Sequence, residues 1–247
     1  MKKTVIYEYY AFGYNYHILR SGIDGQKKGQ AKVSLQGFLR NLEKLELQVT
    51  KLIAEELGAI TAEIEAGGDE VTDDHAEKVA KIIERLDPAL DAELRLKSAY
   101  ILTKKRYSLE SLLSSPTDLL SKKTPATMTE TSLRDFASAC RLIALSQSTA
   151  AAFHLMRALE EQVRVLYNAF KKRDRLKNPM WGSIIKELRG KRNPKPSDKL
   201  LDHLDGMRVH FRNPTQHPDV FYNIDEAQDL LNQTMTAINM IAAELPQ

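Results

Sequence analysis

The chain has 247 residues, of which 43% are hydrophobic and 28% are charged, a composition typical of a globular protein and not of a disordered or collagen-like one. No stretch approaches the roughly 18 uncharged apolar residues of a membrane span, and tyrosines and a glutamate interrupt the basic N-terminus, so we expect neither export nor membrane insertion. The single cysteine, Cys140, excludes disulfides within the chain and any zinc site with several cysteines, which favours a reducing, cytoplasmic setting.

The first third of the chain predicts long helices. Residues 3–18 hold five tyrosines and a phenylalanine with no clear period, so we assign no element there; these rings suit a core, an interface or base stacking. From Val33 to Ala66 the apolar residues recur every three or four positions. This spacing predicts one helix, beginning near Ser34 and ending at Gly67, with a length of about 50 Å at about 1.5 Å per residue. We expect such a helix to pair with another helix or another subunit.

The middle of the chain is less regular. A helix is predicted over residues 72–86, and Asp87-Pro88 is expected to open a further one. Residues 96–107 suit either a helix or a short strand, which leaves room for one short β-hairpin. Residues 114–131 combine Ser, Thr and Pro without a period, as a loop between domains does.

The C-terminal half predicts a bundle of four main helices and one minor one. Their apolar stripes cover residues 133–143, 153–170, 181–188, 200–211 and 227–245. The fourth should end near Arg212, because Asn213 precedes Pro214, and Asn223 with Glu226 forms a capping box for the last. We therefore predict an all-α fold, with an N-terminal helical region over residues 1–120, for oligomerisation or for sensing a partner, and a bundle over 131–247.

Positive charge concentrates in one segment. Residues 171–199 carry 11 basic and 3 acidic side chains, whereas the net charge of the whole chain is only +3. Such a local excess is a candidate contact surface for a polyanion. The alternative is a solvated loop that binds nothing.

The junction FRNPTQHPDVFYN carries the candidate chemistry. It holds Arg212, Asn213 and His217 and is stiffened by two prolines. If the turn folds back, an arginine fork for phosphate oxygens and a histidine that accepts protons near neutral pH can converge on one phosphate, as metal-free RNA cleavage requires. The alternative is that Arg212 only complements a helix C-terminus and that His217 is a solvated loop histidine.

The C-terminal half resembles the HEPN superfamily (higher eukaryotes and prokaryotes nucleotide-binding), in particular bacterial members with an Arg-Asn-Pro-Thr-x-His turn. The resemblance rests on FRNPTQHPDVFYNIDEAQDL, TAAAFHLMRALEEQVRVLY and WGSII, covers about residues 131–247, reaches weakly to 105–113 and omits the N-terminal helices. In that superfamily, Arg, a polar residue, three further residues and His mark metal-independent endoribonucleases, with two such motifs facing each other across a dimer. The resemblance therefore implies a HEPN-like bundle, no cofactor and no metal.

Roles carry over to matching positions. The resemblance implies that Arg212 and His217 are catalytic, that Asn213 supports them, and that Glu160 orients one of them. The alternative for Glu160 is an ordinary surface ion pair along its helix. We interpret His154, on the same helix, as a packed histidine and not as a catalyst. The expected RNA-binding residues are Lys171, Lys172, Arg173 and Arg208.

Two functions stay open at this point. The first is a metal-independent endoribonuclease, a toxin or an anti-phage defence effector, that cleaves RNA through its 2′-hydroxyl. It would act in the cytoplasm as a homodimer or higher homo-oligomer, under an antitoxin or another defence-system partner protein. The second is a non-catalytic HEPN-type scaffold or regulatory module that binds a partner protein or a nucleotide.

Overall fold

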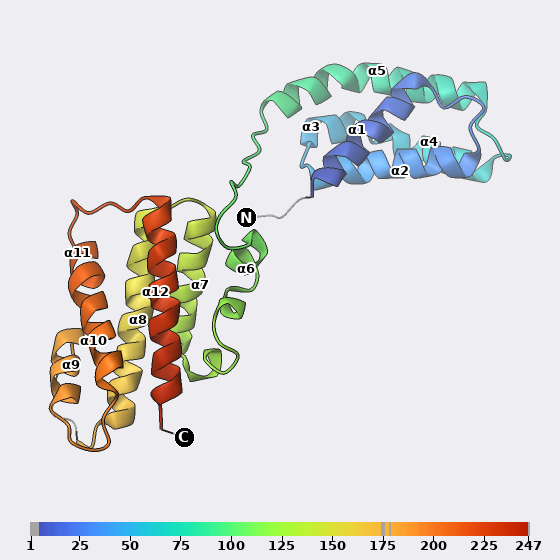
Figure 1. The fold of residues 1–247 in the computed structure, drawn as a ribbon. Helices are drawn as coiled ribbons and strands as arrows, with labels where there is room; N and C mark the ends of the chain where they lie inside the picture. The colour runs from blue at the N-terminus through green and yellow to red at the C-terminus, as the bar shows by residue number, and fades with distance from the viewer. Residues whose placement is uncertain (1–4, 174–175, 178, 247) are drawn as a thin grey trace. The chain divides into compact units, whose positions relative to one another are not determined.

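The computed structural model describes residues 5–173, 176–177 and 179–246 and is helical throughout its regular structure (Figure 1), which confirms the predicted all-α fold. Among these residues the only β-type pairing is one isolated bridge, between Lys27 and Glu70. No helix in the same part of the chain is both long enough and apolar enough to cross a membrane. Contacts divide the chain into two units, Met1–Tyr100 and Ile101–Gln247, each with its own hydrophobic core.

The N-terminal unit begins with a helix that the sequence did not predict. Helix α1 turns Phe12 and Leu19 into the core, and the Tyr16 hydroxyl donates a hydrogen bond to Asp87. Four of its tyrosines are exposed, so a core role is wrong for Tyr7, Tyr9, Tyr10 and Tyr14. The helices of this unit are α1 (Ile6–Ser21), α2 (Lys28–Lys44), α3 (Gln48–Ile53), α4 (Glu56–Ala66) and α5 (Asp73–Arg95).

The single 50 Å helix predicted over residues 33–66 is wrong, because the chain turns back on itself. Glu46 adopts a left-handed φ of 56°, and the Leu47 N–H donates to the Leu42 carbonyl, which closes α2 in a Schellman-type turn. The apolar stripe is therefore divided among α2, α3 and α4. Its buried members pack inside this unit, whereas Val49 and Leu52 are exposed. The stripe no longer argues for a second subunit.

The helix break predicted at Asp87-Pro88 is also wrong, because α5 continues through Pro88. Proline inside a helix removes one hydrogen bond and costs about 3 kcal/mol. The buried stripe of α5 runs on both sides of Pro88, with Val79, Ile83 and Leu86 before it and Leu90 after it. Burial of Leu90 with the rest of this stripe offsets the lost hydrogen bond and keeps the helix in one piece.

The second unit begins before the predicted bundle. Residues 96–107 form neither of the predicted elements, because this segment has no regular secondary structure. Residues 114–129 are loops and 3₁₀ turns, as the composition indicates, but they pack on this unit, where the Asn239 side chain accepts hydrogen bonds from the Ser121 N–H (3.0 Å) and the Thr124 hydroxyl (2.8 Å). The boundary between the units thus lies at residue 100, and residues 101–120, assigned to the N-terminal region from the sequence, belong with the bundle.

The bundle itself follows the predicted stripes closely. Helices α7 and α8 pack side by side and are joined by a turn in which Ser146 has a left-handed φ of 59° and the Gln147 N–H donates to the Leu142 carbonyl. Helix α12 packs on α8, and α9 and α10 pack on each other. The helices are α6 (Leu109–Leu113), α7 (Glu130–Ala144), α8 (Ser148–Phe170), α9 (Trp181–Arg189), α10 (Asp198–Met207), α11 (Asn213–Thr215) and α12 (Ile224–Glu244).

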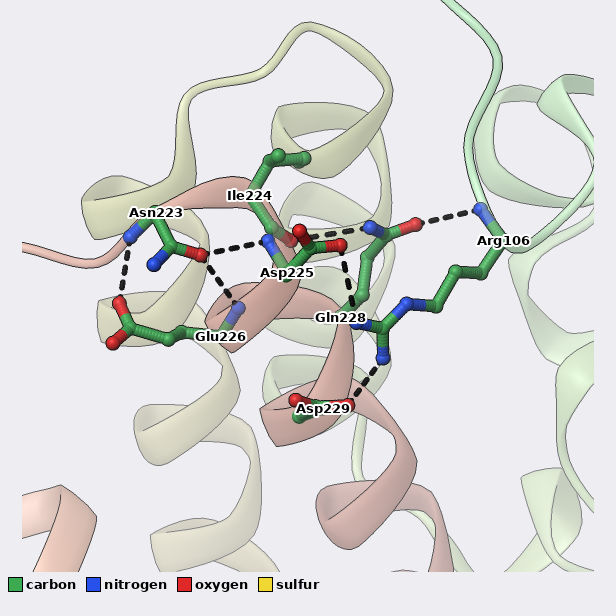
Figure 2. A network of polar contacts seen from close by, with 7 residues as sticks. All are labelled: Arg106, Asn223, Ile224, Asp225, Glu226, Gln228 and Asp229. Carbon is green, nitrogen blue, oxygen red and sulfur yellow. Dashed lines mark hydrogen bonds and ion pairs between the residues drawn. The ribbon is translucent and has the colours of Figure 1, made fainter.

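A polar network fixes the start of α12 and ties it to residue 106 (Figure 2). The capping box predicted from the sequence is present: Asn223 Oδ1 accepts from the N–H groups of residues 225 and 226, and Glu226 Oε2 accepts from the Asn223 N–H at 2.8 Å. The Arg106 guanidinium pairs with Asp225 and Asp229, and its backbone N–H donates to the buried Gln228 Oε1 at 2.7 Å. The segment before α6 is thereby attached to α12.

We expect Gln228→Ala to lower the free energy of unfolding of the bundle by about 1 to 2 kcal/mol. The substitution removes the acceptor for the Arg106 N–H and the donor to the Ile224 carbonyl, both inside the network. Chemical denaturation measures the change. Asn232→Ala, on an exposed position of the same helix, is the control and should change stability by less than about 0.5 kcal/mol. Equal effects of the two substitutions would contradict this account.

Cys140 should be inert in the folded protein. Its side chain is fully buried in α7, and burial raises the pKa of the thiol to about 12, so the reactive thiolate is scarce at neutral and mildly alkaline pH. At pH 8 we expect a thiol-specific chromogenic reagent to react only after denaturant unfolds the bundle. Rapid labelling of the native protein would show that α7 opens readily.

Candidate functional site

The turn that carries Arg212 and His217 begins with a π-helical segment. Helix α10 passes into π turns over Arg208–Arg212, where the Asn213 N–H bonds the Arg208 carbonyl, and then into the short helix α11. The predicted helix end near Arg212 is therefore wrong by three residues. The wider π turn changes the hydrogen-bond register just before Pro214, so the missing N–H of that proline does not stop the helical path.

Hydrogen bonds hold the end of this turn on the first residues of α8. The Thr215 hydroxyl donates to the Phe211 carbonyl at 2.6 Å and lies 2.8 Å from the Tyr222 hydroxyl. The Tyr222 N–H donates to Thr149 Oγ1 at 3.0 Å. The 212–217 turn is thus continuous with α10 at its start and is joined to α8 through Tyr222 at its end.

Arg212 is joined to Glu160, the partner expected from the sequence. Its Nε donates to Glu160 Oε2 at 3.1 Å, and both side chains are largely buried, with 25% and 18% of their surface exposed. Glu160 also lies 3.5 Å from the Arg164 guanidinium. Because Nε binds the carboxylate and no hydrogen bond with the described residues engages the two terminal amino groups of Arg212, these groups can bind a ligand.

His217 lies in a groove of about 450 Å³ between the start of α8 and the loop after α11. The groove also exposes two aromatic rings, because 39% of the Phe153 surface and 78% of the Phe221 surface are accessible. The apolar stripe predicted over 153–170 put Phe153 on the buried face of its helix, and no periodic pattern in the sequence marked Phe221. The residues that line the groove are Thr149, Ala150, Phe153, His154, Thr215, Gln216, His217, Pro218, Val220 and Phe221.

Arg212 and Asn213 do not line this groove. Asn213 is exposed, and its carbonyl accepts the Gln216 N–H at 3.2 Å. Arg212 sits against Glu160, six residues and about 9 Å further along α8 than His154. Within one chain, Arg212 and Asn213 therefore do not lie on the wall of the groove that holds His217. A phosphate bound in the groove does not meet all three side chains.

His154 has a partner that the sequence did not reveal. Its Nδ1 lies 2.8 Å from Oδ1 of Asp135, a side chain of α7 that is only 5% exposed. The Arg157 Nε approaches the other oxygen of the same carboxylate at 3.2 Å and its guanidinium covers the Phe153 ring. The ring nitrogen of His154 is satisfied as predicted, but the residue belongs to the wall of the groove.

The basic segment forms a second hollow, of about 600 Å³, next to α9. Arg173 belongs to its lining, and the Lys172 Nζ donates to the Asn193 carbonyl at 3.4 Å. Among the described residues that line it, Glu187 is the acidic one. The basic residues that line it are Lys172, Arg173, Lys186, Lys191 and Arg192. This basic cavity therefore concentrates positive charge where the composition predicted it.

The other two expected RNA contacts are less open. The Lys171 ammonium lies over the Tyr167 ring, 5.9 Å from its centre. Arg208 pairs with Asp205 at 2.9 Å, and its side chain packs against Gly182. Neither of these two residues lines the basic cavity.

The groove and the basic cavity lie at opposite ends of α8. His154 is on the second turn of the helix and Lys172 lies two residues beyond its last residue, so about 25 Å separates them along the helix. Within one chain the basic segment therefore does not border the groove that holds His217, because α8 is straight and carries the two features at its two ends (Figure 1).

A metal centre has no support in the described residues, where no group of three His, Cys, Asp or Glu side chains could hold an ion. Comparison of the chain with protein-family models, with curated proteins and with solved structures finds no match. Membership of the HEPN superfamily therefore stays a prediction. The features of the structure that bear on function are the groove, the Glu160–Arg212 pair and the basic cavity.

The Glu160–Arg212 pair should couple more strongly than an exposed pair. Partial burial weakens solvent screening, so a double-mutant cycle with Glu160→Gln and Arg212→Gln should give a coupling free energy of about 1 kcal/mol or more. The control cycle uses Arg189 and Asp202, which are 2.8 Å apart but 42% and 65% exposed, and should give less than about 0.5 kcal/mol. Equal coupling in the two cycles would mean that Glu160 does not hold Arg212.

Proposed function

We propose that this chain is a metal-independent endoribonuclease. The observation that carries the proposal is the groove in which His217 lies beside two exposed phenylalanine rings, and the arginine that Glu160 holds lies outside this groove, further along α8. A histidine can move a proton near neutral pH, and exposed aromatic rings stack on the unpaired bases of RNA. The motif in the 212–217 turn, which resembles the HEPN nucleases, supports the same reaction.

The proposed reaction uses the 2′-hydroxyl of RNA as the nucleophile. His217 takes the hydroxyl proton as the 2′-oxygen attacks phosphorus, the bond from phosphorus to the 5′-oxygen breaks, and a second group must return a proton to that oxygen. The terminal amino groups of Arg212 stabilise the negative charge on the phosphate oxygens, with Asn213 in support. Because Arg212 is displaced along α8 from the groove, the RNA backbone must run along that helix to meet both groups.

The basic cavity supplies affinity in this proposal. Its side chains attract RNA phosphates without regard to sequence, about 25 Å from the groove along α8. The bound RNA must therefore span several nucleotides, anchored at one end of α8 and cleaved at the other.

The biological setting proposed is a toxin or an anti-phage defence effector that a partner protein restrains. A homodimer is proposed because the resemblance implies paired motifs, and pairing would add a second Arg212 and a second Asn213 near each groove. The N-terminal helices no longer argue for it, since their stripe is buried in their own unit.

We expect His217→Ala and Arg212→Ala each to reduce RNA cleavage at least about a hundredfold, since each removes a proton acceptor or a charge stabiliser. The assay mixes purified protein with total RNA and follows fragments, whose ends should be 2′,3′-cyclic phosphate and 5′-hydroxyl. A deoxyribose at the scissile position should block cleavage, and chelators should have no effect. Stability should be nearly unchanged for His217→Ala, because His217 is exposed.

His17→Ala, at an exposed position of α1, is the matched control and should leave cleavage unchanged. Cleavage that depends on a divalent ion, or that survives in His217→Ala, would contradict the proposed mechanism. Absence of cleavage by the wild-type protein on every RNA tested would contradict the endoribonuclease itself.

Charge reversal in the basic cavity should weaken RNA binding steeply. Lys172→Glu, Arg173→Glu and Lys191→Glu together remove three phosphate contacts, so the slope of log affinity against log salt should become shallower by about 2 to 3. Fluorescence anisotropy with a single-stranded RNA measures both quantities. Lys122→Glu with Lys123→Glu, on an exposed loop of the same unit, is the control. An unchanged affinity and slope would mean that the basic segment is only a solvated loop.

One observation favours the second candidate, a non-catalytic module that binds a partner protein. On α1, Tyr7, Tyr10 and Tyr14 are exposed and lie in a row with ring centres 6.0 and 6.3 Å apart. Exposed tyrosines are enriched at protein interfaces. The cleavage assay separates the two candidates, because only the first requires His217.

A further inference from the structure

The groove contains two histidines, from two different elements. His217 comes from the turn after α11, and His154 comes from the second turn of α8; both line the same hollow of about 450 Å³. The proposed cleavage needs two proton transfers, one from the 2′-hydroxyl and one to the 5′-oxygen. A single histidine cannot hold and release a proton at the same moment.

The surroundings of His154 suit the second transfer. Its Nδ1 is engaged by Asp135 at 2.8 Å, and that carboxylate is almost completely buried on α7. A buried carboxylate at Nδ1 fixes the orientation of the ring, while Nε2 is left as the nitrogen that can exchange a proton with a bound group. Among the described residues, no hydrogen bond from a side chain or the backbone occupies Nε2.

Two neighbours of His154, Arg157 and Phe153, also contact each other. Arg157, on the same helix, shares the Asp135 carboxylate through its other oxygen and covers Phe153, whose ring meets the His154 ring edge to face at 6.0 Å. Within the part of the chain that the structure describes, no carboxylate pairs with the His217 ring: the residue is exposed, and its backbone N–H donates to the Pro214 carbonyl. The two histidines therefore differ, since of the two His154 alone has an anionic partner among these residues.

We infer that His154, held by Asp135, is the general acid of this groove and protonates the 5′-oxygen that leaves, while His217 is the base. This inference rests on the proposed endoribonuclease function. In the step, the 2′-oxygen to phosphorus bond forms as the phosphorus to 5′-oxygen bond breaks, His217 gains the proton of the 2′-hydroxyl, and His154 loses its proton to the 5′-oxygen. The products are a 2′,3′-cyclic phosphate and a 5′-hydroxyl.

The test uses a leaving group that needs no proton. Two pools of single-stranded RNA with random sequence are compared, identical except that one linkage carries sulfur in place of the bridging 5′-oxygen, because a thiolate leaves without protonation. On ordinary RNA, His154→Ala should be slower than the wild type by at least about a hundredfold. At the sulfur linkage the same variant should cleave within a few-fold of the wild-type rate, whereas His217→Ala should stay slow on both.

Asp135→Asn provides a second variant that keeps the shape of the partner and removes its charge. Like His154→Ala, this variant should cleave ordinary RNA slowly and should cleave the sulfur linkage at close to the wild-type rate. His17→Ala is the control and should match the wild type on both pools, and circular dichroism with thermal unfolding checks that each variant folds.

Two outcomes would overturn the assignment of His154. Wild-type rates in His154→Ala on ordinary RNA would mean that the acid lies elsewhere, for example on a second copy of the chain. Equal losses on both pools would mean that His154 only supports the structure. These outcomes differ from failure of the endoribonuclease proposal, in which the wild-type protein itself cleaves neither pool.

Discussion

The burial of α8 is the constraint on which the rest of the second unit depends. The helix packs against α7 and α12, and its apolar stripe is almost completely covered, so the core sets its rotation about its own axis. That rotation decides that Phe153, His154 and Glu160 reach the surface beside the 208–222 segment. A shift of one residue would turn them by about 100° and remove them from the site.

Burying a paired charge costs less free energy than burying an isolated one, but a buried pair does not by itself make the fold more stable. The Glu160–Arg212 pair and the Asp135 carboxylate, shared by His154 and Arg157, join different helices in partly buried positions. Desolvation opposes such pairs, and well-packed apolar residues would often serve the fold equally well. His154 lines the groove and the Glu160–Arg212 pair lies further along α8, so the two sets of charges share one helix but not one hollow.

Local sequence signals predicted the bundle because stripes and caps act over one or two turns. The helices around Phe136 and Trp181 and the capping box at Asn223 needed no tertiary information. Two of the errors fell at Glu46 and Pro88. A non-glycine residue took the left-handed conformation at the first, and core burial outweighed a lost hydrogen bond at the second. Both outcomes depend on contacts with residues far away in the chain.

The sequence by itself determined which side chains could do chemistry in the second unit: a permanently charged Arg212, a titratable His217 and a carboxylate at Glu160 on an amphipathic helix. Tertiary structure decided which of them meet. The antiparallel packing of α7 on α8 brings Asp135 to His154, 19 residues away, and the π turn directs Arg212 to Glu160 instead of into the groove. Spacing along the chain does not reveal these pairs, because they depend on how helix faces rotate when the core is buried.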